Sequence, residues 1–577
     1  MRAIMLALVV LSGCTDERVL VLKRVPLACG GPIPATQVQV GAEGDFPPVV
    51  VSQPPDTPIS IAGFPQDLRV LTVRGLSGGM EALIGRTGVI DLAQAPGSLP
   101  IAYGPPGRYC VTGTMSAPRS GHAAVKMRDG RVLVAGGGMQ SIEIYDPQAA
   151  AWSGYDSLQF PAAAYAATLL DDGRVMIVGG QGAQLVDASG RLQRPALFLR
   201  GPIRASAPVL VRLADGNLLV AGGGAEASVI YDRRLGDFVD GPHVAPRNGG
   251  HGFLLANGHV LLVGGSAPAP PAEVLADFGS AGSGALLDGE TAFPVAWAPL
   301  PTGAFLGVHG SMHDLMLRSD GTWFALAGPP SARTTGAQAT ALADDLVLVT
   351  GGDATAAADL FLAARGALVS AGQLPLSAHQ GASATLLDDG TVLFAGGENA
   401  PAAPSANAVV YFHNLVSSYS TSKVLTFDTD EPTVIPFDPT QARRVGGGYV
   451  LDAGNRALLG GMRFRAVTVR LAFVSMPGDL DVIIGYENEL SYDVVRFPAA
   501  GGATQLVRAG VVLCTGAAAP PGGFVTVDVR AGQVSARAQD GGRLLDCTPM
   551  PALPERFAIG VGAENGPVSV DNIEVTR

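Results

Sequence analysis

Short apolar runs that alternate with polar positions recur along the chain and predict β-strands. His122 to Met127 has the pattern of one strand, Asp129-Gly130 that of a two-residue hairpin turn, and Arg131 to Ala135 that of the returning strand. Ile142 to Tyr145 alternates as a third strand, and the segment around Trp152 supplies a fourth. No segment shows a sustained helical period, so we predict an all-β protein.

This four-strand unit repeats between residues 114 and 414. A Gly-Gly pair follows the returning strand of each clear copy, and the pairs are Gly136-Gly137, Gly179-Gly180, Gly222-Gly223, Gly264-Gly265, Gly351-Gly352 and Gly396-Gly397. Successive pairs lie 42 to 45 residues apart, except for one interval of 87. That interval is two periods, so we place a degenerate fifth unit at Asp320-Gly321 and Phe324 to Gly328, delayed by an insertion near Ser266 to Gly284. The pattern predicts seven units, with the fifth atypical.

A hairpin, a Gly-Gly pair, a Tyr-Asp pair and a tryptophan share this period. Tyr145-Asp146, Tyr231-Asp232, Trp152 and Trp297 carry the aromatic part of the pattern, which resembles the kelch motif. The resemblance covers about half of the chain and implies a seven-bladed kelch-type β-propeller. In such propellers one blade is commonly completed by strands from both chain ends. Arg108 to Gly113 could complete the last unit in this way, or could be the last strand of the preceding module.

The segments that flank the repeat are also rich in predicted strands. Residues 14–113 have the pattern of a tether followed by a small β-sandwich of immunoglobulin-like size. Residues 415–577 carry no repeat, and their ending, Val568 to Val575, resembles the closing strand of concanavalin-like (laminin-G-like) jelly rolls. That resemblance implies a C-terminal jelly-roll module of a kind that often binds sugars or matrix ligands.

The N-terminus has the form of an export signal. Met1 and Arg2 give a small positive region, and Ala3 to Leu11 form a short apolar stretch. The tetrad Leu-Ser-Gly-Cys that ends at Cys14 resembles a bacterial lipobox, which implies cleavage of residues 1–13 and lipidation of Cys14. An ordinary secretory signal with a chance cysteine is the alternative. We expect an exported protein anchored by lipid alone to the outer membrane, facing either the periplasm or the surface.

The cysteine count agrees with export. The chain has five cysteines, and lipidation of Cys14 leaves four, in two groups at opposite ends of the sequence. Pairing each within its own terminal module predicts the disulfides Cys29–Cys110 and Cys514–Cys547.

Charge excludes one class of partner. The net charge is -12, and the few lysines and many arginines form no basic stripe. We therefore expect no nucleic-acid partner.

Candidate catalytic and metal-binding residues are few. Copper-radical oxidases with kelch propellers need a cysteine that is crosslinked to a tyrosine. No cysteine lies between residues 110 and 514, so we exclude this class of enzyme. The string Ser319 to Trp323 looks like a sialidase Asp-box but occurs once, and we interpret it as a turn. His122, His251 and His379 are interpreted as equivalent structural positions of the repeat, and His309 with His313 as a pair without further metal ligands.

The C-terminal segment contains an acidic run that carboxylate chemistry makes a weak calcium candidate. Its members are Asp479, Asp481, Glu487, Asn488 and Glu489, and a solvated loop is the favoured interpretation. We otherwise expect no cofactor and no catalytic residue.

Three kinds of function are compatible with these residues. The leading hypothesis is a monomeric, non-catalytic, lipid-anchored envelope protein that binds a protein or glycan through propeller loops and the jelly-roll module. The alternative is a carbohydrate-active hydrolase with carboxylates in the propeller funnel, and a third option is a structural spacer of the envelope. The side chains that line the central channel should distinguish binding from hydrolysis.

Overall fold

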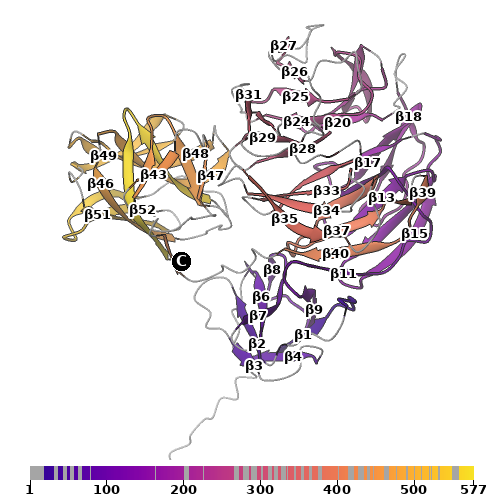
Figure 1. The fold of residues 1–577 in the computed structure, drawn as a ribbon. Coiled ribbons are helices and arrows are strands. Elements are labelled where there is room, and N and C mark those ends of the chain that lie inside the picture. The colour runs from indigo at the N-terminus through magenta and orange to yellow at the C-terminus, as the bar shows by residue number, and fades with distance from the viewer. Residues whose placement is uncertain are drawn as a thin grey trace, which may run out of the picture.

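In the computed structural model of the protein, strands joined by turns account for the regular structure (Figure 1). It describes residues 19–576 apart from 31–34, 36, 43–48, 52–56, 63–67, 78–79, 163, 200–206, 225, 256, 266–271, 277–284, 287–294, 301–302, 309–314, 318–322, 327–332, 334–335, 343–345, 353–356, 363–366, 375–379, 401, 414–421, 426–433, 438–441, 446–447, 460–466, 476, 489–490, 500, 509, 519, 521–522, 531–532 and 549–557. No α-helix occurs among these residues, which confirms the all-β prediction.

Seven four-stranded antiparallel sheets occupy the central part of the described chain. In six of them the hydrogen-bonded order follows the sequence. The first three sheets contain β12 (His122–Lys126), β13 (Val132–Gly136), β14 (Ser141–Asp146) and β15 (Ala151–Ser157); β16 (Ala166–Leu169), β17 (Val175–Gly179), β18 (Gly182–Val186) and β19 (Leu197–Phe198); and β20 (Val209–Arg212), β21 (Leu218–Ala221), β22 (Ala227–Asp232) and β23 (Asp237–His243).

The next three sheets follow the same order. They contain β24 (His251–Leu254), β25 (Val260–Val263), β26 (Ala272–Leu275) and β27 (Ala285–Leu286); β28 (Ala296–Pro299), β29 (Phe305–Val308), β30 (Leu315–Leu317) and β31 (Trp323–Ala325); and β32 (Gln338–Ala341), β33 (Leu346–Thr350), β34 (Ala357–Leu362) and β35 (Ala367–Gln373).

The seventh sheet joins two distant parts of the chain. Its order is β11-β40-β37-β36, made of β11 (Arg108–Val111), β40 (Ala408–Phe412), β37 (Val392–Gly396) and β36 (Ala382–Leu386). Figure 1 shows β11, β40 and β37 side by side. Tyr109 pairs with Tyr411, and Cys110 with Val410. Two roles were left open for Arg108 to Gly113, and the structure shows the first: β11 completes the last sheet of the repeat. The predicted boundary at residue 113 had assigned this segment to the N-terminal module. A small ribbon, β38 (Glu398–Ala400) and β39 (Ala403–Pro404), extends from the same sheet.

The first strands of neighbouring sheets contact one another around a ring. β12 contacts both β16 and β36, β20 contacts β16 and β24, and β32 contacts β28 and β36. Phe253 of β24 meets Phe305 of the fifth sheet at a ring-centroid distance of 4.7 Å, which completes the circuit. The innermost strands are therefore β12, β16, β20, β24, β28, β32 and, in the seventh sheet, β36, and the arrangement is propeller-like.

The hairpin between the first two strands differs from the predicted two-residue turn. Met127 N–H donates to the carbonyl oxygen of Arg131, and Gly130 N–H donates to that of Met127, so the loop has three residues. The φ of Gly130 is 85°, the left-handed geometry that such a loop places at its third residue. The Asp-Gly signal is common to both loop lengths, which is why the sequence alone misassigned it.

The fifth sheet corrects the sequence interpretation. Its first hairpin lies at Leu300 to Ala304, where Leu300 N–H donates to the carbonyl oxygen of Ala304, and not at Asp320-Gly321. Trp297, expected in a fourth strand, lies in the first strand β28. In the sequence, His309-Gly310 stands where the other units have the Gly-Gly pair. The period of the repeat is therefore regular, and the first glycine of the pair is replaced by histidine in this unit.

The N-terminal strands form three small sheets. A sheet of order β4-β1-β9 contains β1 (Val19–Arg24), β4 (Ile59–Ala62) and β9 (Ser98–Ile101); a second, β10-β7-β6-β2-β3, contains β2 (Gln37–Ala42), β3 (Val49–Val51), β6 (Leu71–Ser77), β7 (Met80–Arg86) and β10 (Tyr103–Gly104); and β5 (Leu68–Arg69) pairs with β8 (Ile90–Asp91). Val25, Leu27 and Ile84 share a buried apolar cluster with strands of the first and seventh sheets. The N-terminal segment is thus packed onto the ring where the ring closes.

The C-terminal segment forms two large sheets over one core. One has the order β43-β44-β55-β46-β51-β52-β53, with β41 also paired to β55, and the other has the order β42-β45-β54-β47-β48-β49-β50. The strands are β41 (Ser422–Leu425), β42 (Val434–Pro436), β43 (Ala442–Val445), β44 (Gly448–Leu451), β45 (Arg456–Leu459), β46 (Val467–Ser475), β47 (Asp479–Asn488), β48 (Ser491–Phe497), β49 (Ala503–Arg508), β50 (Val511–Ala518), β51 (Gly523–Arg530), β52 (Gln533–Ala538), β53 (Arg543–Cys547), β54 (Ala558–Glu564) and β55 (Val568–Thr576). Leu471, Val527, Val482 and Val561 come from both sheets and belong to one buried cluster.

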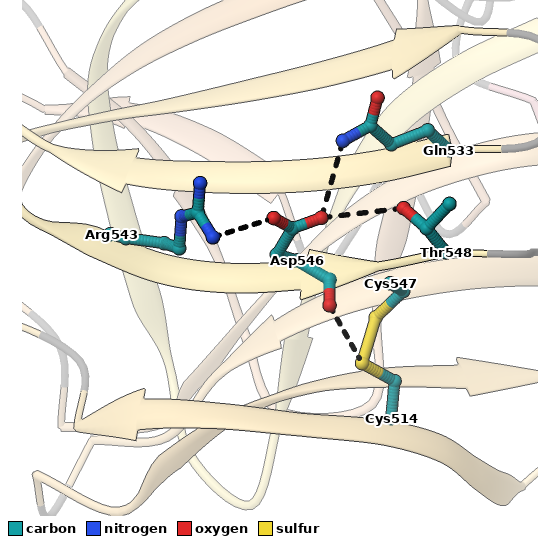
Figure 2. The surroundings of a disulfide bond; sticks show 6 residues. All are labelled: Cys514, Gln533, Arg543, Asp546, Cys547 and Thr548. Carbon is teal, nitrogen blue, oxygen red and sulfur yellow. Dashed lines mark hydrogen bonds and ion pairs between the residues drawn. A yellow bond between two sulfur atoms is a disulfide. The ribbon is translucent and has the colours of Figure 1, made fainter.

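Both predicted disulfides are present. Cys29–Cys110 ties the N-terminal segment to β11, and Cys514–Cys547 joins the end strands β50 and β53 of the two C-terminal sheets (Figure 2). Figure 2 also shows Asp546 of β53 bound by Arg543, Gln533 and Thr548 beside that bridge. Among the described residues, no helix is long and apolar enough to cross a bilayer.

Candidate functional site

The innermost strands of the ring carry no carboxylate. Their sequences are HAAVK, AATL, VLVR, HGFL, AWAP, QATA and ASATL, from β12, β16, β20, β24, β28, β32 and β36. Small and apolar side chains therefore predominate on these seven strands. His122 Nε2 lies 2.8 Å from Ser383 Oγ, which links the first and seventh sheets across this ring.

Carboxylates are instead held at a repeated position further out. In the first sheet, Arg119 precedes the innermost strand and its guanidinium bonds Glu143 at 3.0 Å, with exposures of 0% and 1% for the two side chains. The same guanidinium donates to the carbonyl oxygens of Gly136 at 2.8 Å and Ser141 at 2.9 Å. Glu143 also accepts from the backbone N–H of Ser116 at 2.6 Å. We call this buried arrangement the arginine clip.

Two further sheets contain the same clip. Arg247 bonds Glu273 at 2.9 Å and donates to the carbonyl oxygen of Gly264 at 2.8 Å. Arg333 bonds Asp359 and donates to the carbonyl oxygen of Gly351 at 3.0 Å. In each case the accepting carbonyl belongs to a glycine at the end of the second strand. Gly136 is the last residue of β13, and Gly264 and Gly351 directly follow β25 and β33.

The clip makes these acids poor catalytic groups. The carboxylates of Glu143, Glu273 and Asp359 are each engaged by a guanidinium, which leaves them less free to act on a substrate. Arg247 itself has a lowered pKa, because burial outweighs the opposing effect of Glu273. The clip thus fastens the segment before the innermost strand to the turn after the second strand, which is a structural role.

The clips were not identified from the sequence, although a signal exists. Arginine stands 17 or 18 residues before the first glycine of the pair at Arg119, Arg247 and Arg333, and an acid follows that glycine by seven to nine residues. The other units lack one or both members, which hid the pattern.

The histidines are not equivalent as predicted. His122 lies opposite Gly136 in the sheet register, whereas His251 lies opposite Val263, one position earlier relative to the glycine pair. Burial lowers the pKa of both, that of His122 to about 4. His309, His313 and His379 lie outside the described residues.

An open groove of about 610 Å³ lies between the sixth and seventh sheets. Tyr109, Tyr411, Arg108, Gln373 and Cys29 contribute to its lining, together with Ser370. Tyr109 stacks on Tyr411 with ring centroids 4.5 Å apart, and its hydroxyl is buried without a hydrogen-bond partner among the described residues. Aromatic rings beside polar groups and an open volume make this groove the best candidate contact surface on the ring.

A smaller cavity of about 100 Å³ lies between the N-terminal segment and the hairpins of the first and seventh sheets. Its lining includes Arg86, Asp129, Asp388 and Asp389. Burial raises the pKa of Asp389, and the nearby Arg86 opposes that rise. Burial lowers the pKa of His413, which follows the last strand of the ring, to about 4, and Arg86 acts in the same direction.

The two described aspartates of the C-terminal acidic run are held by different partners. Asp481 is bonded by Arg496 at 2.7 Å and 2.8 Å, and Asp479 accepts from the backbone N–H of Ala499 and from Asn565. Glu487 is described only as part of β47, and Glu489 lies outside the described residues, as does Cys14. No group of three or more His, Cys, Asp or Glu residues that could hold a metal ion occurs in the described part of the chain.

Comparisons with known proteins give fold-level likeness. No protein-family model and no curated protein matches the sequence. Among solved structures, a streptogramin B lyase is 13% identical with a TM-score of 0.41, covering 52% of this chain and 96% of that one. A fungal alcohol oxidase of the AA5 family in complex with copper is 12% identical with a TM-score of 0.32, over 92% and 98%. The carbohydrate-binding module CBM66 from Bacillus subtilis is 8% identical with a TM-score of 0.21, over 24% and 91%. The chain is all-β, with β-propeller-like structural neighbours, and these distant similarities assign it no activity.

Proposed function

We propose that this protein is a non-catalytic, lipid-anchored component of the bacterial cell envelope that binds a protein or glycan. In this proposal the ring is a seven-bladed kelch-type propeller, flanked by an N-terminal β-sandwich and a C-terminal jelly roll. The lipid on Cys14 holds the protein at the outer membrane, and the groove beside Tyr109 is the main contact surface of the propeller.

One observation carries the proposal over the hydrolase alternative. The seven innermost strands contain no aspartate or glutamate, and Glu143, Glu273 and Asp359 are bonded by arginines in the clips. Hydrolysis of a glycosidic bond needs two carboxyl groups that face the substrate from opposite sides. The groove, by contrast, offers stacking and hydrogen-bonding groups suited to recognition.

Binding is tested with residues 14–577 carrying Cys14→Ser, so that the protein is soluble. We expect selective retention on a defined array of bacterial envelope glycans and peptides, and loss of that retention when Ser370→Trp fills the groove. Ser153→Trp, on the outermost strand of the first sheet, is the matched control and should bind normally. Release of reducing sugar from a polysaccharide panel, abolished by an Asp or Glu substitution in the ring, would replace this proposal by the hydrolase.

The anchor is tested in the full-length protein. We expect Cys14→Ser to move the protein from the membrane fraction to the soluble fraction, because a diacyl or triacyl anchor is lost. Unchanged membrane association of that variant would contradict the lipoprotein assignment.

A further inference from the structure

Strand β50 (Val511–Ala518) exposes three consecutive large apolar side chains. Val511, Val512 and Leu513 are 62%, 48% and 40% exposed. Every other exposed large apolar residue in the described part of the chain stands alone in the sequence. Successive side chains of a strand alternate between its two faces, so these three leave apolar area on both faces of the same strand.

The strand is held firmly but is open along one edge. It pairs with β49 on one side and is the last strand of its sheet. Cys514 is bridged to Cys547 of β53, and a Cβ at Gly516 would lie 1.9 Å from the carbonyl oxygen of Leu544, so β53 packs closely against β50 (Figure 2). No backbone hydrogen bond joins β50 to a described strand other than β49.

The other end strands of the two sheets carry the residues that normally prevent edge pairing. β43 contains Arg443 and Arg444, β53 contains Arg543 and Asp546, and β42 contains Pro436. β50 has the sequence VVLCTGAA, without charge or proline. Its pairing with β49 has two register shifts, and such irregularities bend a strand. They do not supply the charged side chains or the proline that protect the other end strands. Charge and proline are the usual protection of a free edge, so β50 differs from its three counterparts in lacking both.

We propose that β50 pairs antiparallel with β50 of a second copy of this chain, so that the two seven-stranded sheets join across a two-fold axis. The strand is complementary to itself, because its first three residues are bulky and its last three are Gly516, Ala517 and Ala518. Two-fold pairing centred on Thr515 sets Val512 opposite Ala518 and Leu513 opposite Ala517 of the second copy.

A second copy fits this edge better than an unrelated partner does. An uncharged strand meets itself without like-charge repulsion, and the nearby carboxylate of Asp546 is already bonded by Arg543 at 2.8 Å. The proposal departs from the monomer expected from the sequence, and it is independent of the proposed ligand-binding function.

Sedimentation velocity of the Cys14→Ser protein, without reductant and from about 1 to 100 µM, tests the proposal. We expect a concentration-dependent dimer. Val512→Lys should give a monomer over the same range, because a charged side chain on a free edge prevents edge pairing and would here lie opposite Ala518 of the second copy. Val445→Lys is the matched control: Val445 is 57% exposed on β43, and its substitution should leave the dimer unchanged.

Amide hydrogen exchange locates the contact. In the dimer the backbone N–H groups of β50 on its open edge should exchange more slowly than in Val512→Lys, with β43 unchanged. A wild-type monomer at 100 µM, a dimer that survives Val512→Lys, or equal loss of the dimer in Val445→Lys would each overturn the proposal. Retention of the wild-type melting temperature by both variants excludes unfolding as the cause.

Discussion

At the scale of single residues, the arginine clips concentrate charge where water is absent. Arg119 and Arg247 are each 0% exposed, and their acids 1% and 3%. Such a pair is tolerated because the guanidinium also bonds backbone carbonyls, which satisfies donors that one carboxylate cannot reach. Removal of one member leaves the other buried and uncompensated.

We expect Glu143→Ala to destabilise the ring by about 3–5 kcal/mol, because Arg119 would lose its counter-charge inside the protein. The control is Asp388→Ala, which removes the 2.6 Å pair with Lys126, whose side chains are 52% and 34% exposed. That change should cost less than about 1 kcal/mol. Urea unfolding measures both, and equal losses would contradict the structural role of the clip.

Two buried histidines predict the direction of the pH dependence. The folded-state pKa values of His122 and His413 are lowered to about 4, so the unfolded chain binds more protons below about pH 6.5. The free energy of unfolding should therefore fall as pH drops from about 6.5 to 4, by up to about 1.4 kcal/mol per pH unit for each histidine. The pKa of Asp389 is raised in the folded protein, so this residue has the opposite effect: its contribution to the free energy of unfolding falls as pH rises above the ordinary pKa of an aspartate.

Urea midpoints between pH 4.5 and 7.5 measure this slope. His122→Gln, which keeps a hydrogen-bonding side chain toward Ser383, should reduce it, and His243→Gln at an exposed position should not. A slope that is the same in wild type and His122→Gln would mean that the imidazole of His122 binds protons equally in the folded and unfolded chain, which would contradict its lowered pKa.

At the scale of the element, the hairpin between the innermost strand and the next strand is the most regular feature of the repeat. The same three-residue loop occurs after Met127, Leu170, Leu213, Leu255 and Leu387, with an Asp or Asn side chain that accepts from the backbone two residues on. Glycine is needed at its third position, because the backbone there has a positive φ.

We expect Gly130→Ala to destabilise the ring by about 1–2 kcal/mol. Its φ is 85°, and a Cβ there would lie 2.7 Å from Oδ2 of Asp388. Gly154→Ala is the control, since no atom lies within 4 Å of its Cβ position and its strand is exposed. Calorimetry should show a lower melting temperature for the first variant only; the reverse order would mean that the loop geometry is wrong.

At the scale of the whole molecule, the ring is closed by pairing β11 with β40, residues that lie about 300 positions apart in the sequence. The bridge Cys29–Cys110 then fastens the N-terminal segment to the closing strand. The second bridge, Cys514–Cys547, lies wholly within the C-terminal sheets.

The two disulfides should therefore stabilise different parts of the molecule. We expect Cys29→Ser with Cys110→Ser to cost about 2–5 kcal/mol in the unfolding transition of the ring. Cys514→Ser with Cys547→Ser should instead lower the transition of the C-terminal sheets and leave that of the ring unchanged. Calorimetry with hydrogen exchange assigns each transition, and a shift of both by either pair would show that the two parts unfold together.

Local patterning by itself determined the strand-rich class and the period of the repeat, and it predicted the pairing of the cysteines that the structure shows. These follow from side-chain alternation, from glycines that a turn requires and from the distribution of five cysteines along the chain. Where a marker residue changed, as at His309-Gly310, the same reasoning moved the fifth hairpin by some 20 residues to Asp320-Gly321.

Only the tertiary structure decided which distant residues meet. The choice of β40 as the partner of β11, the burial of Arg119 against Glu143, and the exposure of Val511 to Leu513 each depend on contacts across sheets. The sequence pattern of a central strand does not differ from that of an edge strand. An arginine in the sequence likewise does not show whether its side chain is buried or exposed to solvent. Their roles are set by neighbours that only the closed ring and the stacked sheets bring into contact.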